Sequence, residues 1–218
     1  MKILTLAIGE DFRNKLHRAL QSKRDYCNKH GYEFIIGNEQ FWDRNRPIAW
    51  SKVPFLLSVL EQCEENEILF LSDADVYITN MNLRIEEHIV PLLLENKDLL
   101  MTIDSCGNIN DGNILMRNTP WLRDFWKRVY TQTDLIYHIW WENAAVIRLL
   151  EENKSDLEKI QITSKYKLFN AYIQGIPGAS LWEPGDFLVH FAGIYDPSQI
   201  AEYINDIDNG KIPRKNIF

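Results

Sequence analysis

The sequence is poor in cysteine, glycine and proline, and it lacks long apolar runs. Its 218 residues include three scattered cysteines, Cys27, Cys63 and Cys106, with no Cys-x-x-Cys pair and no Cys/His spacing typical of zinc. A disulfide framework or structural zinc site is therefore not expected. Ten glycines and eight prolines without a low-complexity tract exclude collagen-like and disordered chains. No stretch approaches the roughly 18 apolar residues of a membrane span, so we expect a cytoplasmic protein.

Positive charge is also in short supply. Lysine and arginine number 24 against 31 aspartates and glutamates, which gives a formal net charge of −7. No basic excess is present to neutralise phosphates, so we do not expect a binder of duplex nucleic acid or of an anionic membrane. The 45% hydrophobic and 25% charged residues are ordinary for a globular protein with a buried core. The length favours one domain over residues 1–218.

Short apolar runs alternate with amphipathic segments. The predicted strands are 2–9, 32–37, 67–75, 98–104 and 186–193, and a loop is expected at 111–118. The predicted helices are 12–30 (capped by Asp11), 51–63, 84–96, 119–130, 139–153 and a short one after Pro197. Strands that alternate with helices indicate an α/β fold with a mostly parallel sheet. Because ligands bind at the carboxyl ends of such strands, polar residues at those positions are expected to share one site.

Two carboxylates end the buried strand at 67–75. The pattern Asp73-Ala74-Asp75 is weak evidence alone, since the chain contains a second Asp-x-Asp at Asp206 and Asp208. Its position is informative, because carboxylates at a buried strand end are costly unless they are solvated, paired or bound to a cation. Two hard oxygen donors facing a cleft suit Mg²⁺ or Mn²⁺. A strand-end cap or a salt bridge is the structural alternative.

Six sequence blocks occur in a fixed order along the chain. They are YCNKHGYEFIIG (26–37), AWSKVPFLLSVL (49–60), EILFLSDADVYITN (67–80), NDGNILMRNTPW (110–121), WWENAAV (140–146) and GDFLVHFAG (185–193). In this order and spacing they resemble the fungal and plant galactosyl-, xylosyl- and mannosyltransferase family. The resemblance covers roughly residues 1–193 and implies the GT-A fold of nucleotide-sugar glycosyltransferases. The chain is also similar in size and layout to the anchorless glycosyltransferase domains of large algal DNA viruses, which would place it in a host cytoplasm.

The Asp-x-Asp pattern also occurs in haloacid-dehalogenase-like phosphohydrolases. The two aspartates of their DxDx[TV] motif superficially match Asp73 and Asp75 in the segment from Asp73 to Val76. In that class the motif usually lies on the first strand, and a later GDxxxD supplies further metal carboxylates. Here about 70 residues precede Asp73, and GDFLVH has His190 where the second aspartate is needed. The phosphohydrolase interpretation is the weaker one.

The glycosyltransferase resemblance implies a role for several residues. Asp75 is the expected direct metal ligand, Asp73 orients the ribose and the waters of the metal, and His190 matches the distal metal-binding histidine. An imidazole ligand favours Mn²⁺, with Mg²⁺ as the alternative. Further residues are expected at the UDP-sugar: Lys52 at a phosphate, Gly193 beside the diphosphate, and the backbone of Ala7, Ile8 and Gly9 at the base and ribose.

Two departures from the family pattern affect the expected mechanism. Asp111 replaces a small or hydroxylic residue in the family's N-x-G block, and Ala144 stands where retaining members have an aspartate. We therefore favour an inverting transfer, which needs one general base to deprotonate the acceptor hydroxyl. Asp111 and Glu142 are the candidates, with Asp104 third, and an ordinary surface role for Glu142 is the alternative.

The expected function is a metal-dependent transfer of a hexose or deoxyhexose from a UDP-sugar to a glycan hydroxyl, with a GDP-sugar as the less favoured donor. Trp42, Trp140 and Trp141 are candidates for an aromatic acceptor platform, and Trp42 is preferred because it lies in a polar loop. Trp121, Phe125 and Trp126 are expected in the core. The rival is a non-catalytic glycan- or nucleotide-binding module, which the loss of the aspartate at position 144 favours.

Overall fold

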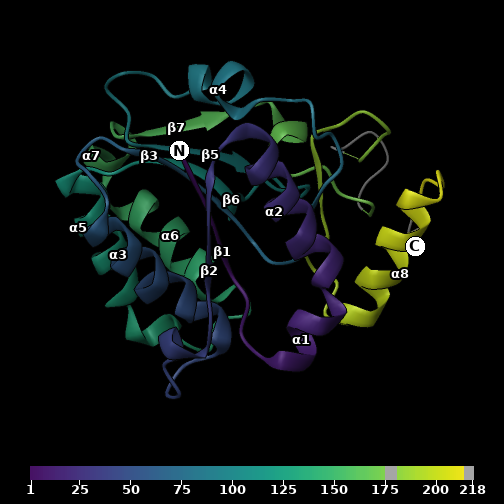
Figure 1. The fold of residues 1–218 in the computed structure, drawn as a ribbon. Helices are drawn as coiled ribbons and strands as arrows, with labels where there is room; N and C mark the ends of the chain where they lie inside the picture. Colours follow the sequence, from purple (N-terminus) through teal and green to yellow (C-terminus); the bar gives the residue numbers. More distant parts are fainter. Residues whose placement is uncertain (175–180, 214–218) are drawn as a thin grey trace.

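A six-stranded sheet forms the centre of the molecule, with helices on both of its faces (Figure 1). The computed structural model describes residues 1–174 and 181–213. The strand order is β2-β1-β3-β6-β5-β7. The strands are β1 (Lys2–Leu6), β2 (Glu33–Gly37), β3 (Ile68–Ser72), β5 (Leu99–Ile103), β6 (Ile109–Arg117) and β7 (Ile160–Thr163). Only β6 runs antiparallel to its neighbours in this sheet, which confirms the predicted mostly parallel α/β fold.

Alternate side chains of each strand enter opposite cores, because successive residues of a strand point to opposite faces. In β3, Leu69 and Leu71 pack under α3 (Lys52–Gln62), α5 (Pro120–Tyr130) and α6 (Trp141–Glu152). Phe70 packs on the other face, which α2 (His17–His30) and α4 (Ile85–His88) cover (Figure 1). Continuous apolar runs are thus explained by burial on both faces. The predicted core aromatics are confirmed: Phe125 and Trp126 are fully buried, and Trp121 packs against them.

A small second sheet lies beside the main one. It pairs β4 (Val76–Ile78) with β8 (Leu188–His190) in antiparallel fashion, and Val76 lies opposite His190. The strand predicted at 186–193 therefore forms here and not in the main sheet. The loop expected at 111–118 is wrong, because most of this segment belongs to β6, which pairs with both β3 and β5. The remaining helices are α1 (Glu10–Lys15), α7 (Lys154–Leu157) and α8 (Pro197–Asp208). Within the ranges 1–174 and 181–213, no helix has the length and apolar character that crossing a membrane requires.

Two predicted helices differ from those observed. The helix expected at 12–30 is divided between α1 and α2 at Leu16, and Asp11 lies in the first turn of α1 while Gly9 occupies the N-cap. Leu16 is fully buried in a core shared with α8, so tertiary packing outweighs local propensity at this bend. The helix expected at 84–96 is reduced to α4 and a short 3₁₀ turn, Val90–Leu92. Pro91 in that turn disfavours helical backbone at the residue before it.

Candidate active site

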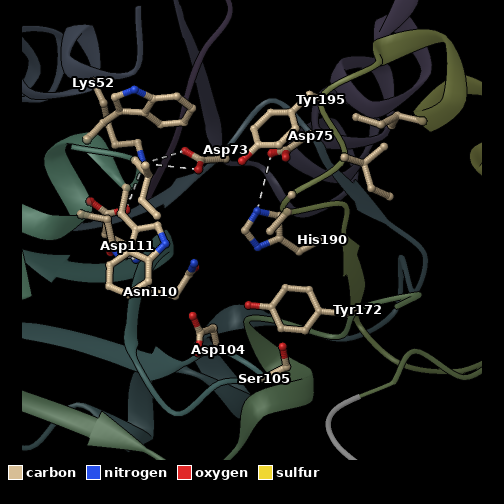
Figure 2. A pocket seen from close by; sticks show the side chains of 18 of the residues that line it. Lys52, Asp73, Asp75, Asp104, Ser105, Asn110, Asp111, Tyr172, His190 and Tyr195 are labelled. Atoms are coloured by element: carbon tan, nitrogen blue, oxygen red, sulfur yellow. Dashed lines mark hydrogen bonds and ion pairs between the residues drawn. The ribbon is translucent and has the colours of Figure 1, made fainter. Parts of the chain in front are cut away.

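A cleft of about 500 Å³ opens at the edge of the sheet where β3 and β5 end and β6 begins. Strand-end residues that are far apart in the sequence meet there (Figure 2). Its polar lining comprises Lys52, Asp73, Asp75, Asp104, Ser105, Asn110, Asp111, Glu142, Asn143, Tyr172, Gln174 and His190. The cleft is thus rich in carboxylates, and Lys52 is the one lysine or arginine among the described residues that line it.

Asp73, Asp75 and His190 form a cluster in which one ligand atom of each residue lies within 4.8 Å of the others. The pairing of β4 with β8 creates it, since Val76 follows Asp75 directly and lies opposite His190. The N–H of Phe191 donates to the carbonyl oxygen of Asp75 at 3.1 Å, which fixes the two segments to each other. Two carboxylates and one imidazole are a donor set that suits Mn²⁺.

A chain of hydrogen bonds fixes the orientation of the His190 ring. The N–H of Gly112 donates to Asn110 Oδ1 (3.0 Å), so the Asn170 atom beside that oxygen is its Nδ2 donor (3.1 Å). Asn170 Oδ1 therefore accepts from His190 Nδ1 (2.8 Å). Nε2 of the neutral ring is then unprotonated, and it lies 3.5 Å from Asp75 Oδ1. A lone pair and a carboxylate at this distance need a proton or a shared cation between them.

Gly112 is required at the start of β6 for steric reasons. A Cβ atom at this position would lie 2.5 Å from His190 Cε1 and 3.0 Å from Asp73 Oδ2. Its carbonyl oxygen also accepts from the N–H of Asp73 at 2.8 Å. The absence of a side chain at Gly112 thus allows β6 to pack directly against the Asp73 carboxylate and the His190 imidazole. Gly193, which also lines the cleft, has a φ of 77°, a left-handed conformation that favours glycine.

The Lys52 ammonium faces Asp73 of this cluster and two further carboxylates, and Figure 2 shows it beside Asp73. Its Nζ is 3.1 Å from Asp73 Oδ1, 3.2 Å from Asp111 Oδ1 and 3.0 Å from Glu142 Oε1. The Lys52, Asp111 and Glu142 side chains are all at least nine-tenths buried. An ammonium group has three protons, so each of them has a carboxylate partner.

Burial and mutual repulsion raise the pKa of two of these acids. Burial raises the pKa of Glu142 to about 7; the neighbouring Lys52 opposes this, and Asp111 adds to it. Burial likewise raises the pKa of Asp73 to about 6 against the opposing effect of Lys52. The pKa of Lys52 itself is raised well above its ordinary value, because the three carboxylates outweigh its burial. The cleft lining thus holds Asp73, Asp75, Asp111 and Glu142 against the single ammonium of Lys52, and a divalent cation would offset the negative charge of the ionised carboxylates.

The structure brings most of the predicted site residues together. Lys52, Asp73, Asp75, Asp111, Glu142, His190 and Gly193 all line the cleft. The lining does not include Ala7, Ile8 or Gly9; Ala7 N donates to Gly37 (3.0 Å) and Gly9 N to Glu39 (2.9 Å). Phe12 of α1 is the residue from that region that faces the cleft.

Of the three tryptophans that were candidates for the acceptor platform, two line the cleft and one does not. Trp140 and Trp141 line the cleft, and Trp140 is about half exposed. Trp42 is not part of the lining, and the Arg44 guanidinium covers its ring at 3.5 Å from the centroid. Trp42 is thus not placed as an acceptor platform in this structure.

Two residues of the candidate site were missed in the sequence. Asn170 is fully buried and orients His190, and the Tyr172 hydroxyl group is buried in the cleft wall with no hydrogen-bond partner among the described residues. Both precede β8 in a segment without regular periodicity, so the sequence offers no pattern that would identify them.

The fold is similar to that of solved glycosyltransferases. A glycosyltransferase involved in the glycosylation of the major capsid of PBCV-1 superposes with a TM-score of 0.76 at 16% identity, over 94% of this chain and 98% of that one. The galactosyltransferase LgtC superposes with a TM-score of 0.58 at 12% identity, over 94% and 96% of the two chains. These likenesses establish a GT-A fold.

Sequence comparison identifies the family. An α-1,2-galactosyltransferase of Schizosaccharomyces pombe, itself uncharacterized, is 24% identical over 81% of this chain and 55% of its own length. Xyloglucan 6-xylosyltransferase 4 of Arabidopsis thaliana is 24% identical over 88% of this chain and 44% of its own length. The chain thus spans about half the length of these relatives. Because residues 4–99 and 94–198 match the family's sequence pattern, the protein belongs to the galactosyl transferase GMA12/MNN10 family.

Proposed function

We propose that the protein transfers a hexose or deoxyhexose from a UDP-sugar to a hydroxyl group of a glycan, with Mn²⁺ as its metal ion. The observation that supports this most strongly is the cluster of Asp73, Asp75 and His190 at the wall of a carboxylate-rich cleft. Membership of a galactosyl transferase family supports the same reaction class. A GDP-sugar is the less favoured donor and Mg²⁺ the less favoured metal. The family assignment argues against the phosphohydrolase alternative.

The charge of the donor explains why a metal ion is needed. The leaving group is a nucleoside diphosphate, which gains negative charge as the glycosidic bond to phosphate breaks. Lys52 cannot neutralise this charge alone, since its protons already face Asp73, Asp111 and Glu142. An acidic cleft of this kind would repel a diphosphate unless a cation were bound.

The donor atoms present fit a divalent transition metal. Asp73 and Asp75 supply carboxylate oxygens, and the hydrogen-bond chain from Gly112 makes Nδ1 the donor of His190, so that Nε2 of the neutral imidazole is the atom available to a metal. Mn²⁺ held there would act as a Lewis acid toward the diphosphate oxygens. An imidazole donor favours Mn²⁺ over Mg²⁺, which prefers oxygen ligands and its own waters.

Gly112→Ala tests this assignment. The added methyl group would overlap His190 Cε1, and the hydrogen bond to Asn170 prevents the ring from moving freely. We expect the variant to fold but to bind UDP in the presence of Mn²⁺ at least about tenfold more weakly, as for other losses of ligand orientation. Calorimetric titration measures this. Wild-type affinity in a folded variant would mean that His190 does not hold the metal.

An inverting reaction is the mechanism we favour. The acceptor hydroxyl oxygen would bond to the anomeric carbon, the bond from that carbon to the diphosphate oxygen would break, and a base would accept the hydroxyl proton. Glu142 and Asp111 each have one carboxylate oxygen without a hydrogen-bond partner among the described residues, and Glu142 is our first candidate because burial raises its pKa to about 7. Asp111 and Asp104 line the same cleft and are the alternatives.

Glu142→Gln is expected to slow transfer by about 100- to 10,000-fold while the affinity for UDP with Mn²⁺ is kept. In the wild type the rate should rise with pH through about 7, because Glu142 must lose its proton before it can accept another. Lys52, Asp111 and Asp73 are the charged groups that face it and set this midpoint. A pH–rate profile checks both statements. If Asp111→Asn or Asp104→Asn removes turnover instead, the base is that residue.

Aromatic side chains at the cleft suit a glycan acceptor. Trp140 lines the cleft and is about half exposed, and Tyr195 lines it with 80% of its surface exposed. Apolar faces of sugars pack against such rings. The Tyr172 hydroxyl, which has no partner within the described part of the chain, offers a hydrogen bond to a sugar hydroxyl at the same cleft. We propose that the acceptor binds between these residues.

A non-catalytic binding module is the second candidate function, and one observation favours it. Ala144 replaces the aspartate of retaining relatives, and in the structure it is buried in α6 and does not line the cleft. Slow hydrolysis of UDP-sugars in the presence of Mn²⁺ distinguishes the two, because only an enzyme releases free sugar. UDP binding without any sugar release or transfer would support the module and contradict our proposal.

A further inference from the structure

Lys23 is a buried lysine outside the cleft. It lies on α2, its side chain has no exposed surface, and it is absent from the cleft lining. Its Nζ donates to the carbonyl oxygen of Val76 at 2.5 Å and to that of Ala74 at 3.4 Å. The ammonium group thus reaches the backbone immediately before and after Asp75.

A buried ammonium group is costly, so its presence needs a cause. Burial lowers the pKa of Lys23 to about 7, while the carboxylates of Asp75 and Asp73 act in the opposite direction. An apolar side chain of the same length would fill this space without the desolvation penalty. The penalty is therefore offset by two kinds of interaction: hydrogen bonds to buried carbonyl oxygens and attraction to the carboxylates of Asp75 and Asp73.

The turn from Asp73 to Val76 depends on Lys23 for half of its carbonyl groups. The carbonyl of Asp73 accepts from the N–H of Val76, and that of Asp75 accepts from the N–H of Phe191. The carbonyls of Ala74 and Val76 accept from Lys23. Its single charged group therefore holds the peptide planes on both sides of Asp75, and through them the direction of the Asp75 side chain.

The neighbouring residue of α2 contacts the same strand. Ser22 Oγ accepts from the N–H of Ile78 at 3.1 Å. Together, Ser22 and Lys23 bind three backbone groups between Ala74 and Ile78, and neither residue lines the cleft. Helix α2 thus holds the turn and β4 in place by these hydrogen bonds, while β4 pairs with β8.

We infer that Lys23 is a positioning residue for the metal site, which sets the geometry of Asp73 and Asp75 from behind the turn without touching substrate or metal. This inference rests on the proposed function, since it assigns Lys23 to the same metal site. Residues that orient metal ligands in this indirect way typically change metal affinity by about 10- to 100-fold when they are replaced.

Lys23→Met tests the inference because methionine fills similar space without charge or donors. We expect a folded protein whose Mn²⁺ affinity, titrated calorimetrically at saturating UDP, is at least about tenfold weaker. Lys29→Met is the matched control, because Lys29 lies exposed on the same helix and binds only Asn82 Oδ1 among the described residues. It should titrate as the wild type does. A purely structural role for Lys23 would lower the melting temperature and leave the Mn²⁺ affinity unchanged.

The outcomes separate this inference from the proposed function. Metal-dependent UDP binding by the wild type together with unchanged Mn²⁺ affinity in folded Lys23→Met would overturn the inference alone. Absence of metal-dependent binding in the wild type would overturn both. If Lys23→Met does not fold, Lys23→Gln, whose uncharged amide group keeps two N–H donors for these carbonyls, is judged by the same titration.

Discussion

Asp75→Asn is expected to abolish metal-dependent UDP binding while the protein stays folded. Asparagine has the same shape but lacks the negative charge that a divalent cation needs, and Asp75 lies within 4.8 Å of both other candidate ligands. Because loss of an orienting residue already costs about 10- to 100-fold, loss of a direct ligand should weaken binding by more than about 100-fold. Calorimetric titration of UDP with Mn²⁺ present measures the loss.

Asp11→Asn is the matched control for this variant. Asp11 is an exposed aspartate of α1 that pairs with Lys15, and it does not line the cleft. Its replacement should leave UDP affinity unchanged. If Asp75→Asn bound UDP with Mn²⁺ as tightly as the wild type, Asp75 would not be a metal ligand and the proposed site would be wrong.

Lys52→Met is expected to destabilise the protein by about 3 to 5 kcal/mol at neutral pH, since removal of one partner leaves buried charges uncompensated. Three carboxylates within 3.2 Å of Nζ would lose their counter-ion. Their mutual repulsion would then be reduced only if they bound protons or a metal cation. The free energy of unfolding, measured in denaturant, should therefore fall strongly.

The pH dependence of this loss has a definite sign. Burial raises the pKa of Glu142 to about 7 and that of Asp73 to about 6, above the roughly 4 of unfolded chains. The native state therefore binds more protons than the unfolded state in this window, and stability falls as pH rises through it. Without Lys52 both pKa values rise further, so the destabilisation should be larger at pH 8 than at pH 5.

Lys211→Met serves as the control, because Lys211 is two-thirds exposed and its replacement should change stability by no more than about 0.5 kcal/mol. A Lys52→Met protein as stable as the wild type at pH 8 would show that the three carboxylates are already protonated or solvated in the native state. The electrostatic description of the cleft would then fail.

The sequence predicted which residues lie at the cleft better than it predicted the hydrogen bonds and ion pairs that each of them makes. The Asp73 and Asp75 pair was placed correctly because a buried strand leads directly into it, and strand ends share one edge of the sheet. Asp111 was placed there too, although β6 begins at this edge instead of ending there. The strand-end rule is sufficient for Asp73 and Asp75, whereas Asp111 was singled out through the family resemblance.

Partners formed across separate elements were not predictable in this way. Lys52 was expected at a phosphate, and its contacts with three carboxylates depend on how α3, β6 and α6 converge. Asn170 lies in a segment without periodicity, so no pattern indicates its contact with His190. Lys23 has no distinguishing feature in the sequence of its helix, and its contact with the Ala74 carbonyl arises only from the packing of α2 beside β4. Hydrogen bonds of this kind are set by tertiary packing, for which one sequence gives no signal.

The central claim is that the cleft binds a nucleoside diphosphate through a metal ion held by Asp73, Asp75 and His190. Titration of UDP into the wild-type protein, first with Mn²⁺ and then with excess EDTA, tests it most directly. We predict saturable binding with Mn²⁺ that EDTA removes. Equal binding under both conditions, or none under either, would contradict the claim.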